Sequence, residues 1–222
     1  MNRRPMLITS AVVIAISALV GAWAWLQLPA GAQVPTHWGA DGQVDGWADK
    51  TIGLFLVPLL QVGMTALFWV IPRIEPRRAN LERSATAYGA MWIGVIVLLG
   101  GLQLLIVAAA LGSTIDTSRL VFIGTGALFV VIGNYLPKVR ANYLVGIRTP
   151  WTLTSELAWT RTHRMGGRLF VLEGLGFILL GVLGVTGTAL VVAIIAAVAV
   201  LLVFTFAYSY VVWKSDPEHR ST

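Results

Sequence analysis

Apolar residues occur along the chain in six long runs, each separated from the next by a more polar segment. The runs lie at residues 6–28, 52–71, 86–111, 119–136, 169–186 and 188–212. Because a helix needs roughly 20 apolar residues to cross about 30 Å of hydrocarbon, runs of this length indicate transmembrane helices. The pattern predicts an all-α polytopic membrane protein with six transmembrane helices.

Two of the polar segments, residues 29–51 and 137–168, are long enough to form structure of their own. The first belongs to a two-span region, residues 1–85, and the second to a four-span region, residues 86–222. The segment at 72–85 is basic, contains prolines and carries no motif. The segment at 184–187 is so short that it predicts a tight turn, with a re-entrant hairpin as the alternative to two full spans.

The charges give an orientation to these helices. Of the residues, 57% are hydrophobic and 12% are charged, whereas soluble domains carry roughly 25% charged residues. Basic residues of polytopic proteins gather on the cytoplasmic side, and only Lys50 and Arg119 fall outside if the N-terminus is cytoplasmic. The inside residues are then Arg3, Arg4, Arg73, Arg77, Arg78, Arg83, Lys138, Arg140, Arg148, Arg161, Arg164, Arg168, Lys214 and Arg220. We therefore expect both termini in the cytoplasm, and we interpret the net charge of +6 as a sign of orientation and not of nucleic-acid binding.

Two further features limit the possible chemistry and processing. The chain contains no cysteine, which excludes disulfides, thiolate metal sites and cysteine nucleophiles. The first apolar run is too long for the core of a typical signal peptide, so we expect an uncleaved first helix.

The outer segment, residues 29–51, contains several acidic residues and a histidine that invite a metal interpretation. Residues 41–46 fit the opening of a calcium-binding loop, but its twelfth position is Ile52, where a bidentate glutamate is required. We therefore predict no metal here. Two interpretations stay open: a folded turn with tryptophans at headgroup level, and a recognition surface for a molecule arriving from outside. The candidate recognition residues are Pro35, His37, Trp38, Asp41, Asp45 and Lys50.

The inner segment, residues 137–168, combines a turn with a predicted helix. Pro150 keeps Thr149 out of helical geometry. Thr152 or Thr154 can then cap a short interfacial helix between the fourth and fifth spans, with Glu156 in its first turn. We expect this helix to end at residues 166–167, where the fifth span begins.

Glu156, Trp159 and His163 share one face of this predicted helix, and arginines occupy another. This distribution is typical of a helix that lies at a bilayer interface. The alternative is catalysis, with Glu156 and His163 as an acid and base and Arg148 holding an anionic substrate. Because we find no nucleophile setting, no zinc-protease motif and no second histidine on this side, we predict no catalytic residues, no metal and no cofactor.

Glu173 lies inside the fifth apolar run, where an ionised group is costly unless it faces the bundle and has a partner. We expect it to connect the inner segment to the bundle core through Arg168, Arg148 or another donor. Proton or ion transport is the competing interpretation.

The stretch GNYLPKVRANYLVGIRTPWTLTSELAWTRTHRMGGRLFVLEGL resembles the signature of the SdpI family, multispanning bacterial immunity proteins against the secreted SDP peptide toxin. The residues that carry the resemblance are Asn142, Gly146, Arg148, Thr149, Pro150, Trp151, Thr152, Trp159, Thr162, His163 and Gly167. The outer segment is similar to a small N-terminal domain often found in the same proteins. Its matching residues are Pro35, His37, Gly42, Asp45, Gly46 and Lys50.

The resemblance implies a multi-pass protein of the bacterial inner membrane that gives resistance to a secreted antimicrobial peptide by binding, and that can relay its presence to a cytoplasmic transcriptional repressor. The expected partners are the lipid bilayer, the toxin and the repressor, and no nucleic acid. The motif residues expected to bind a ligand or partner are Asn142, Arg148, Thr149, Pro150, Trp151, Thr152, Glu156, Trp159, His163 and Glu173. A small-molecule or ion transporter, or a membrane-embedded enzyme that uses Arg148, Glu156 and His163, is the alternative.

Overall fold

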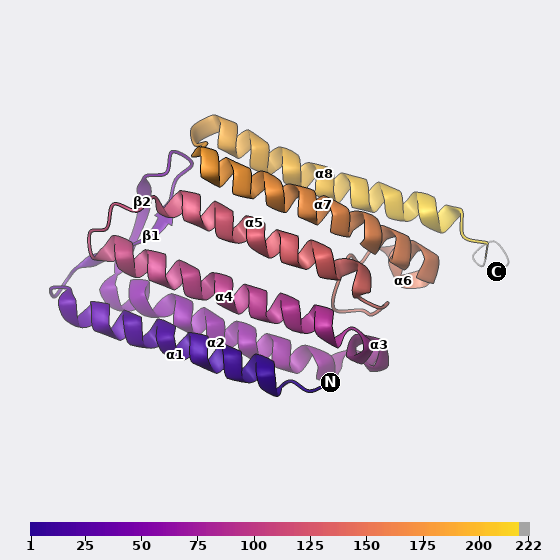
Figure 1. The fold of residues 1–222 in the computed structure, drawn as a ribbon, viewed down its shortest axis with the longest axis horizontal. Helices are drawn as coiled ribbons and strands as arrows, with labels where there is room; N and C mark the ends of the chain where they lie inside the picture. The colour runs from indigo at the N-terminus through magenta and orange to yellow at the C-terminus, as the bar shows by residue number, and fades with distance from the viewer. Residues whose placement is uncertain (218–222) are drawn as a thin grey trace.

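The computed structural model describes residues 1–217, and its six long helices correspond to the six predicted apolar runs (Figure 1). Each is long and apolar enough to cross a membrane, which confirms the predicted six-span architecture. The helices are α1 (Arg4–Gln27), α2 (Lys50–Ile74), α4 (Ala85–Ala110), α5 (Thr117–Tyr135), α7 (Glu156–Leu183) and α8 (Gly187–Lys214). Arg220, which contributed to the predicted orientation, lies outside the described residues.

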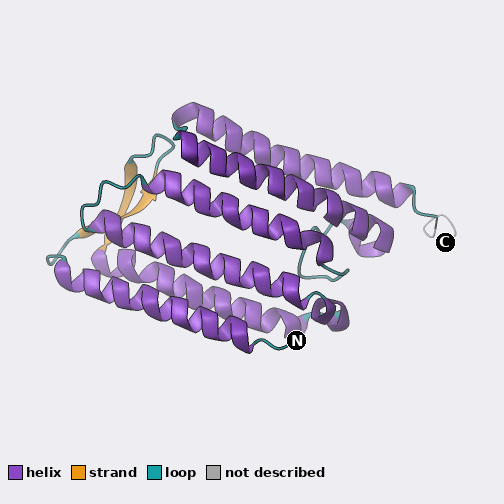
Figure 2. Cartoon of the chain, viewed as in Figure 1, coloured by secondary structure: helices purple, strands orange, loops and turns teal. Residues whose placement is uncertain are grey.

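The helices form two neighbouring groups. Helices α1, α2 and α4 contact one another, α5 packs on both α4 and α7, and α8 packs on α7. The two strands lie at one end of the helices, and the start of α1 and the end of α8 lie at the other (Figure 2). We call the end with the strands the outer end and the opposite end the inner end.

The group of α1, α2 and α4 is held together by a buried aromatic cluster and by polar contacts between helices. Trp92 is fully buried and stacks on Phe68 with 5.6 Å between ring centroids. Its indole Nε1 donates a hydrogen bond to the Ser10 hydroxyl (3.0 Å), and Nε2 of Gln103 donates to the Leu54 carbonyl (2.9 Å). Because lipid tails are as apolar as side chains, such packing and hydrogen bonds, rather than the hydrophobic effect, hold helices together in a membrane.

Helices α5 and α7 approach each other at paired glycines. A Cβ atom added at Gly133 would lie 2.6 Å from the carbonyl oxygen of Gly167, and Gly126 and Gly174 form a second such pair. The two backbones therefore touch directly, which small residues permit and larger ones prevent.

The helix expected to carry Glu156 in its first turn is the start of α7, and its N-cap is Ser155, one residue after the expected Thr154. A separate short helix, α6 (Pro150–Thr154), precedes it and has Thr149 as its N-cap. Ser155 separates α6 from α7. Helix α7 then runs from Glu156 to Leu183 without interruption at residues 166–167, so the expected helix end there is wrong. Both glycines are buried, with Ile147 and Pro137 where their side chains would be, and they serve close packing instead of ending a helix.

The outer segment forms a β-hairpin of β1 (Gln33–Trp38) and β2 (Val44–Asp49), which the apolar pattern did not predict. Val34 of β1 is fully buried against Gly53 of α2. Asp49 caps α2 by accepting a hydrogen bond from the Thr51 amide (2.8 Å). Lys50 donates to the Leu28 carbonyl (3.0 Å) at the end of α1, so both ends of the hairpin are fixed to the membrane helices.

Candidate functional site

Asn142 organises the turn that begins the inner segment. Its side chain is fully buried, and its Oδ1 accepts hydrogen bonds from the amides of Leu144 (3.0 Å) and Val145 (2.7 Å). Its Nδ2 donates to the carbonyls of Arg140 and Val145, both at 2.9 Å. Since the whole side-chain amide is used in shaping the backbone, Asn142 is a structural member of the motif.

His163 is fully buried, and both ring nitrogens bind the backbone. Its Nε2 accepts from the Ile147 amide (3.0 Å), and its Nδ1 donates to the Trp159 carbonyl (2.9 Å). These partners define a neutral ring with the proton on Nδ1. The ring stacks on Trp159 at 4.0 Å, and Trp159 donates from Nε1 to the Val139 carbonyl (2.7 Å).

Gly146 lies against the Nε2 edge of this ring. It has a φ of 116°, a backbone conformation that favours glycine, and a Cβ atom there would collide with Nε2 of His163. The position of His163 in the motif therefore requires a glycine at residue 146.

Thr149 and Thr152 form a reciprocal capping box at the start of α6. The Thr152 amide donates to the Thr149 hydroxyl oxygen (3.2 Å), and the Thr149 amide donates to the Thr152 hydroxyl oxygen (2.9 Å). The Thr149 hydroxyl also donates to the Ser209 hydroxyl on α8 (3.0 Å). The cap of α6 is therefore also a buried contact with the last helix.

Two further contacts attach α6 and the start of α7 to α8. Trp151 packs its ring against Phe206 and Tyr210, with centroids 4.7 and 5.1 Å away. Ser155 caps α7 by accepting from the Ala158 amide (2.9 Å), and its hydroxyl donates to the Asp216 carboxylate (2.5 Å). The inner segment thus holds the inner end of α8 along several turns.

The segment between α2 and α4 contacts the other side of the inner segment, although its sequence suggested only a basic linker. The Glu75 carboxylate is buried and accepts from the Tyr143 amide (3.1 Å). Asn80 donates to the Ala141 carbonyl (2.8 Å), and the Ser84 hydroxyl accepts from the Arg140 amide (2.8 Å). This segment is therefore more than a basic linker, because Glu75, Asn80 and Ser84 bind the start of the inner segment.

The remaining predicted inner residues do not assemble into a catalytic group. Arg148 and Glu156 are exposed, and Arg148 donates to the Tyr143 carbonyl (2.9 Å). His163 is buried with both nitrogens occupied, so it is not available to Glu156 as an acid or base. Oε1 of Glu173 is buried without a hydrogen-bond partner within residues 1–217, so the expected connection from Glu173 to the inner segment is absent there.

At the outer end, a cavity of about 480 Å³ lies between the hairpin and the outer ends of α4, α5 and α8. Its walls combine an apolar floor from the membrane helices with a polar rim from the hairpin and the start of α5. The floor includes Leu102, Val121, Phe122, Leu190 and Ile194, and the rim includes Thr36, His37, Asp45, Thr117 and Ser118. This is the shape and chemistry of a site for an amphipathic ligand.

The rim carries an exposed ion pair between His37 Nδ1 and the Asp45 carboxylate. Asp41 is exposed and accepts from the Gln43 amide (3.1 Å), which shapes the hairpin turn. Of the predicted outer residues, His37, Trp38 and Asp45 line the cavity, whereas Pro35, Asp41 and Lys50 build its frame. Within residues 1–217, no three histidine or acidic side chains lie close enough together to hold a metal.

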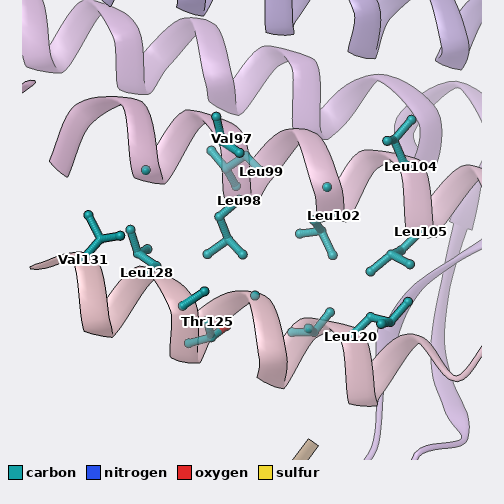
Figure 3. Close-up of a pocket in the computed structure, with 15 residues that line it drawn as sticks. Val97, Leu98, Leu99, Leu102, Leu104, Leu105, Leu120, Thr125, Leu128 and Val131 are labelled. Atoms are coloured by element: carbon teal, nitrogen blue, oxygen red, sulfur yellow. The ribbon is translucent and has the colours of Figure 1, made fainter. Parts of the chain in front are cut away.

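A second hollow, of about 620 Å³, lies between α4 and α5 within the apolar part of the helices (Figure 3). Side chains of Leu98, Leu102 and Leu105 point from α4 toward α5, on which Leu120, Leu128 and Val131 lie. Thr125 is the one polar side chain among its lining residues within the described chain. With so little polar chemistry, this groove can accommodate acyl chains but has little means of selecting a ligand.

Two stretches of the chain match known sequence families. Residues 138–209, from the inner segment to α8, match the SdpI/YfhL protein family. Residues 12–62, from α1 through the hairpin into α2, match a domain of unknown function, DUF1648. No curated protein and no solved structure matches the chain.

Proposed function

We propose that this chain, a member of the SdpI/YfhL protein family, is a membrane immunity protein that protects its host from a secreted antimicrobial peptide by binding it. The observation that carries the proposal is the cavity beneath the hairpin, with its apolar floor and polar rim. It faces the side opposite the basic inner end, which the positive-inside bias assigns to the cytoplasm.

The cavity suits a peptide that arrives at the membrane surface. An apolar side chain of the peptide would enter the floor between Phe122 and Leu190, and its polar backbone or charges would meet His37 and Asp45 at the rim. Binding of this kind removes apolar surface from water while the polar groups fix orientation. It requires no catalytic residue, in agreement with the structural role of His163.

Helix α8 provides a route by which an occupied cavity can influence the inner end. Leu190 and Ile194 of α8 line the cavity, and the Gly187 amide donates to the Ala40 carbonyl of the hairpin (2.6 Å). The other end of the same helix contacts α6 through Ser209 and Phe206. Relay to a cytoplasmic repressor follows if the peptide binds two arrangements of α8 with different affinities.

The test is survival of a toxin-sensitive strain that expresses the protein. Ser118→Trp places a large ring into the cavity and removes no side-chain hydrogen bond observed for Ser118. Thr114→Trp is the matched control, because Thr114 is exposed on the same side and does not line the cavity. We expect wild type and Thr114→Trp to protect and Ser118→Trp to fail at equal membrane abundance. Equal protection by both variants, or none by wild type, contradicts the proposal for that toxin.

A further inference from the structure

A shallow groove of about 590 Å³ lies at the inner end between α5 and α7. It is separate from the outer cavity and from the contacts between the inner segment and α8. Its lining includes Gly133, Gly167, Arg164, Arg168, Val171 and Leu172.

Two arginines give this groove its charge. Arg164 and Arg168 are four residues apart, which places them on the same face of α7. Both are exposed, and neither forms an ion pair with an acidic side chain within residues 1–217. Two unpaired guanidinium groups on one helix face attract an anion that can accept several hydrogen bonds, such as a phosphate.

The floor and the far end of the groove have a different character. Gly133 and Gly167 bring the backbones of α5 and α7 into contact, and the side chains of Val171 and Pro137 pack beside them. Beyond the arginines, toward the middle of the membrane helix, the lining continues as Val171 and Leu172, and Leu172 is 64% exposed. Charge at the membrane surface followed by apolar surface matches the order of parts in a phospholipid.

We propose that this groove binds an anionic phospholipid of the inner leaflet, with its headgroup phosphate held by Arg164 and Arg168 and an acyl chain along Val171 and Leu172. The lipid would then lie across the contact between α5 and α7, beside the glycine pair that sets their separation. This site does not depend on toxin binding, so either proposal can fail without the other.

The experiment measures lipid binding to the purified full chain in a neutral detergent by native mass spectrometry and thermal unfolding. The probes are dioleoylphosphatidylglycerol, dioleoylphosphatidylcholine and inorganic phosphate. The proteins compared are wild type, the double variant Arg164→Gln/Arg168→Gln and the single variant Arg161→Gln. Arg161 is the matched control, because it is an exposed arginine of α7 that does not line the groove.

We expect phosphatidylglycerol to bind and to raise the unfolding temperature of wild type and Arg161→Gln. Its dissociation constant should rise about fivefold for each groove arginine removed, or about 25-fold in the double variant. If the double variant does not fold, the single variants Arg164→Gln and Arg168→Gln carry the same test at about fivefold each.

Three outcomes overturn the proposal. The first is an equal loss of binding in Arg161→Gln, which indicates attraction by net charge alone. The second is an equal effect of phosphatidylcholine, and the third is an equal effect of inorganic phosphate, which indicates an anion site without a lipid.

Discussion

The two ends of this molecule are built in different ways. At the inner end, Asn142, Thr152 and His163 are buried, and their polar atoms bind the backbone of neighbouring segments. At the outer end, His37 and Asp45 are exposed over 71% and 53% of their side-chain surface and bind each other across the hairpin. The polar groups of the inner end are therefore used within the structure, whereas those of the outer end are exposed and accessible to a ligand.

The two family matches cover different parts of the chain. The SdpI/YfhL match covers the inner segment, α7 and most of α8, whereas the DUF1648 match covers the hairpin between α1 and α2. Side-chain to backbone bonding accounts for several uncommon residues of the inner motif, because Asn142, Thr152 and His163 each bind specific backbone groups. We infer that the motif specifies architecture, and that ligand recognition belongs to the outer end.

The largest expected effect comes from removing the buried amide at the inner end. Asn142→Ala leaves the part-buried amides of Leu144 and Val145 without their acceptor. We expect the free energy of unfolding to fall by about 2–4 kcal/mol. Unfolding in neutral detergent measures this change.

Asn134→Ala is the control for that variant, because it removes the same amide from an exposed position at the end of α5. We expect a loss below about 0.5 kcal/mol for the control. Similar losses of unfolding free energy in the two variants would contradict the structural role of the Asn142 side chain.

A smaller effect is expected where the inner segment meets α8. Ser155→Ala removes the cap of α7 and the hydrogen bond to Asp216. We expect a loss of about 1–2 kcal/mol and faster hydrogen exchange at the inner end of α8. Ser215→Ala is the control, because Ser215 is exposed and bonds only locally, to the Val212 carbonyl. Unchanged exchange in Ser155→Ala would argue against the attachment of α8 through this serine.

At the outer end, we expect function to change with little change in stability. His37→Ala and Asp45→Ala break an exposed ion pair, and such pairs contribute about 0–1 kcal/mol. Survival in the presence of toxin should nevertheless fall, because both residues line the rim of the cavity. Glu82→Gln is the control, since it breaks the exposed Arg78–Glu82 pair at the inner end. Full protection by both outer variants would show that the His37–Asp45 ion pair does not contribute to toxin recognition.

The six spans could be predicted because bilayer thickness alone sets the length of an apolar run. The hairpin could not, because its position depends on a packing contact between β1 and the start of α2 that the apolar pattern does not report. Val34 is buried only where Gly53 leaves room for it on α2, and Pro35 and Gly46 interrupt the alternation that normally indicates strands. Similarly, the glycines at 166–167 predicted a helix end. Helix α7 continues through them because they allow close packing against α5 and the inner segment.

The inner site was predictable in part for a related reason. The turn before α6 has a local cause, since Pro150 fixes the geometry of Thr149. The contacts from Glu75 to Tyr143 and from Asn80 to Ala141 join residues more than sixty positions apart, and no local pattern reports them. Burial of His163 likewise follows from packing, and its position on a helix face could not distinguish a buried ring from an accessible acid or base.

The smallest expected effect separates binding from transport. Glu173→Gln removes the one charge from the apolar part of α7 while keeping the shape of the side chain. If protection depends on binding at the outer cavity, survival should match wild type, since Oε1 of Glu173 has no hydrogen-bond partner within residues 1–217. Stability should be equal or higher, because an ionised carboxylate is costly at membrane depth.

Glu156→Gln is the control for this variant, because it makes the same change at an exposed position at the start of α7. If the protein instead moves protons or ions, Glu173→Gln should abolish protection and ion flux in proteoliposomes, while Glu156→Gln retains both. That result would shift the functional centre from the ends of the helices to the membrane interior. The contrast between a fixed inner end and an open outer end would then describe the frame of a transporter and not the two faces of a receptor.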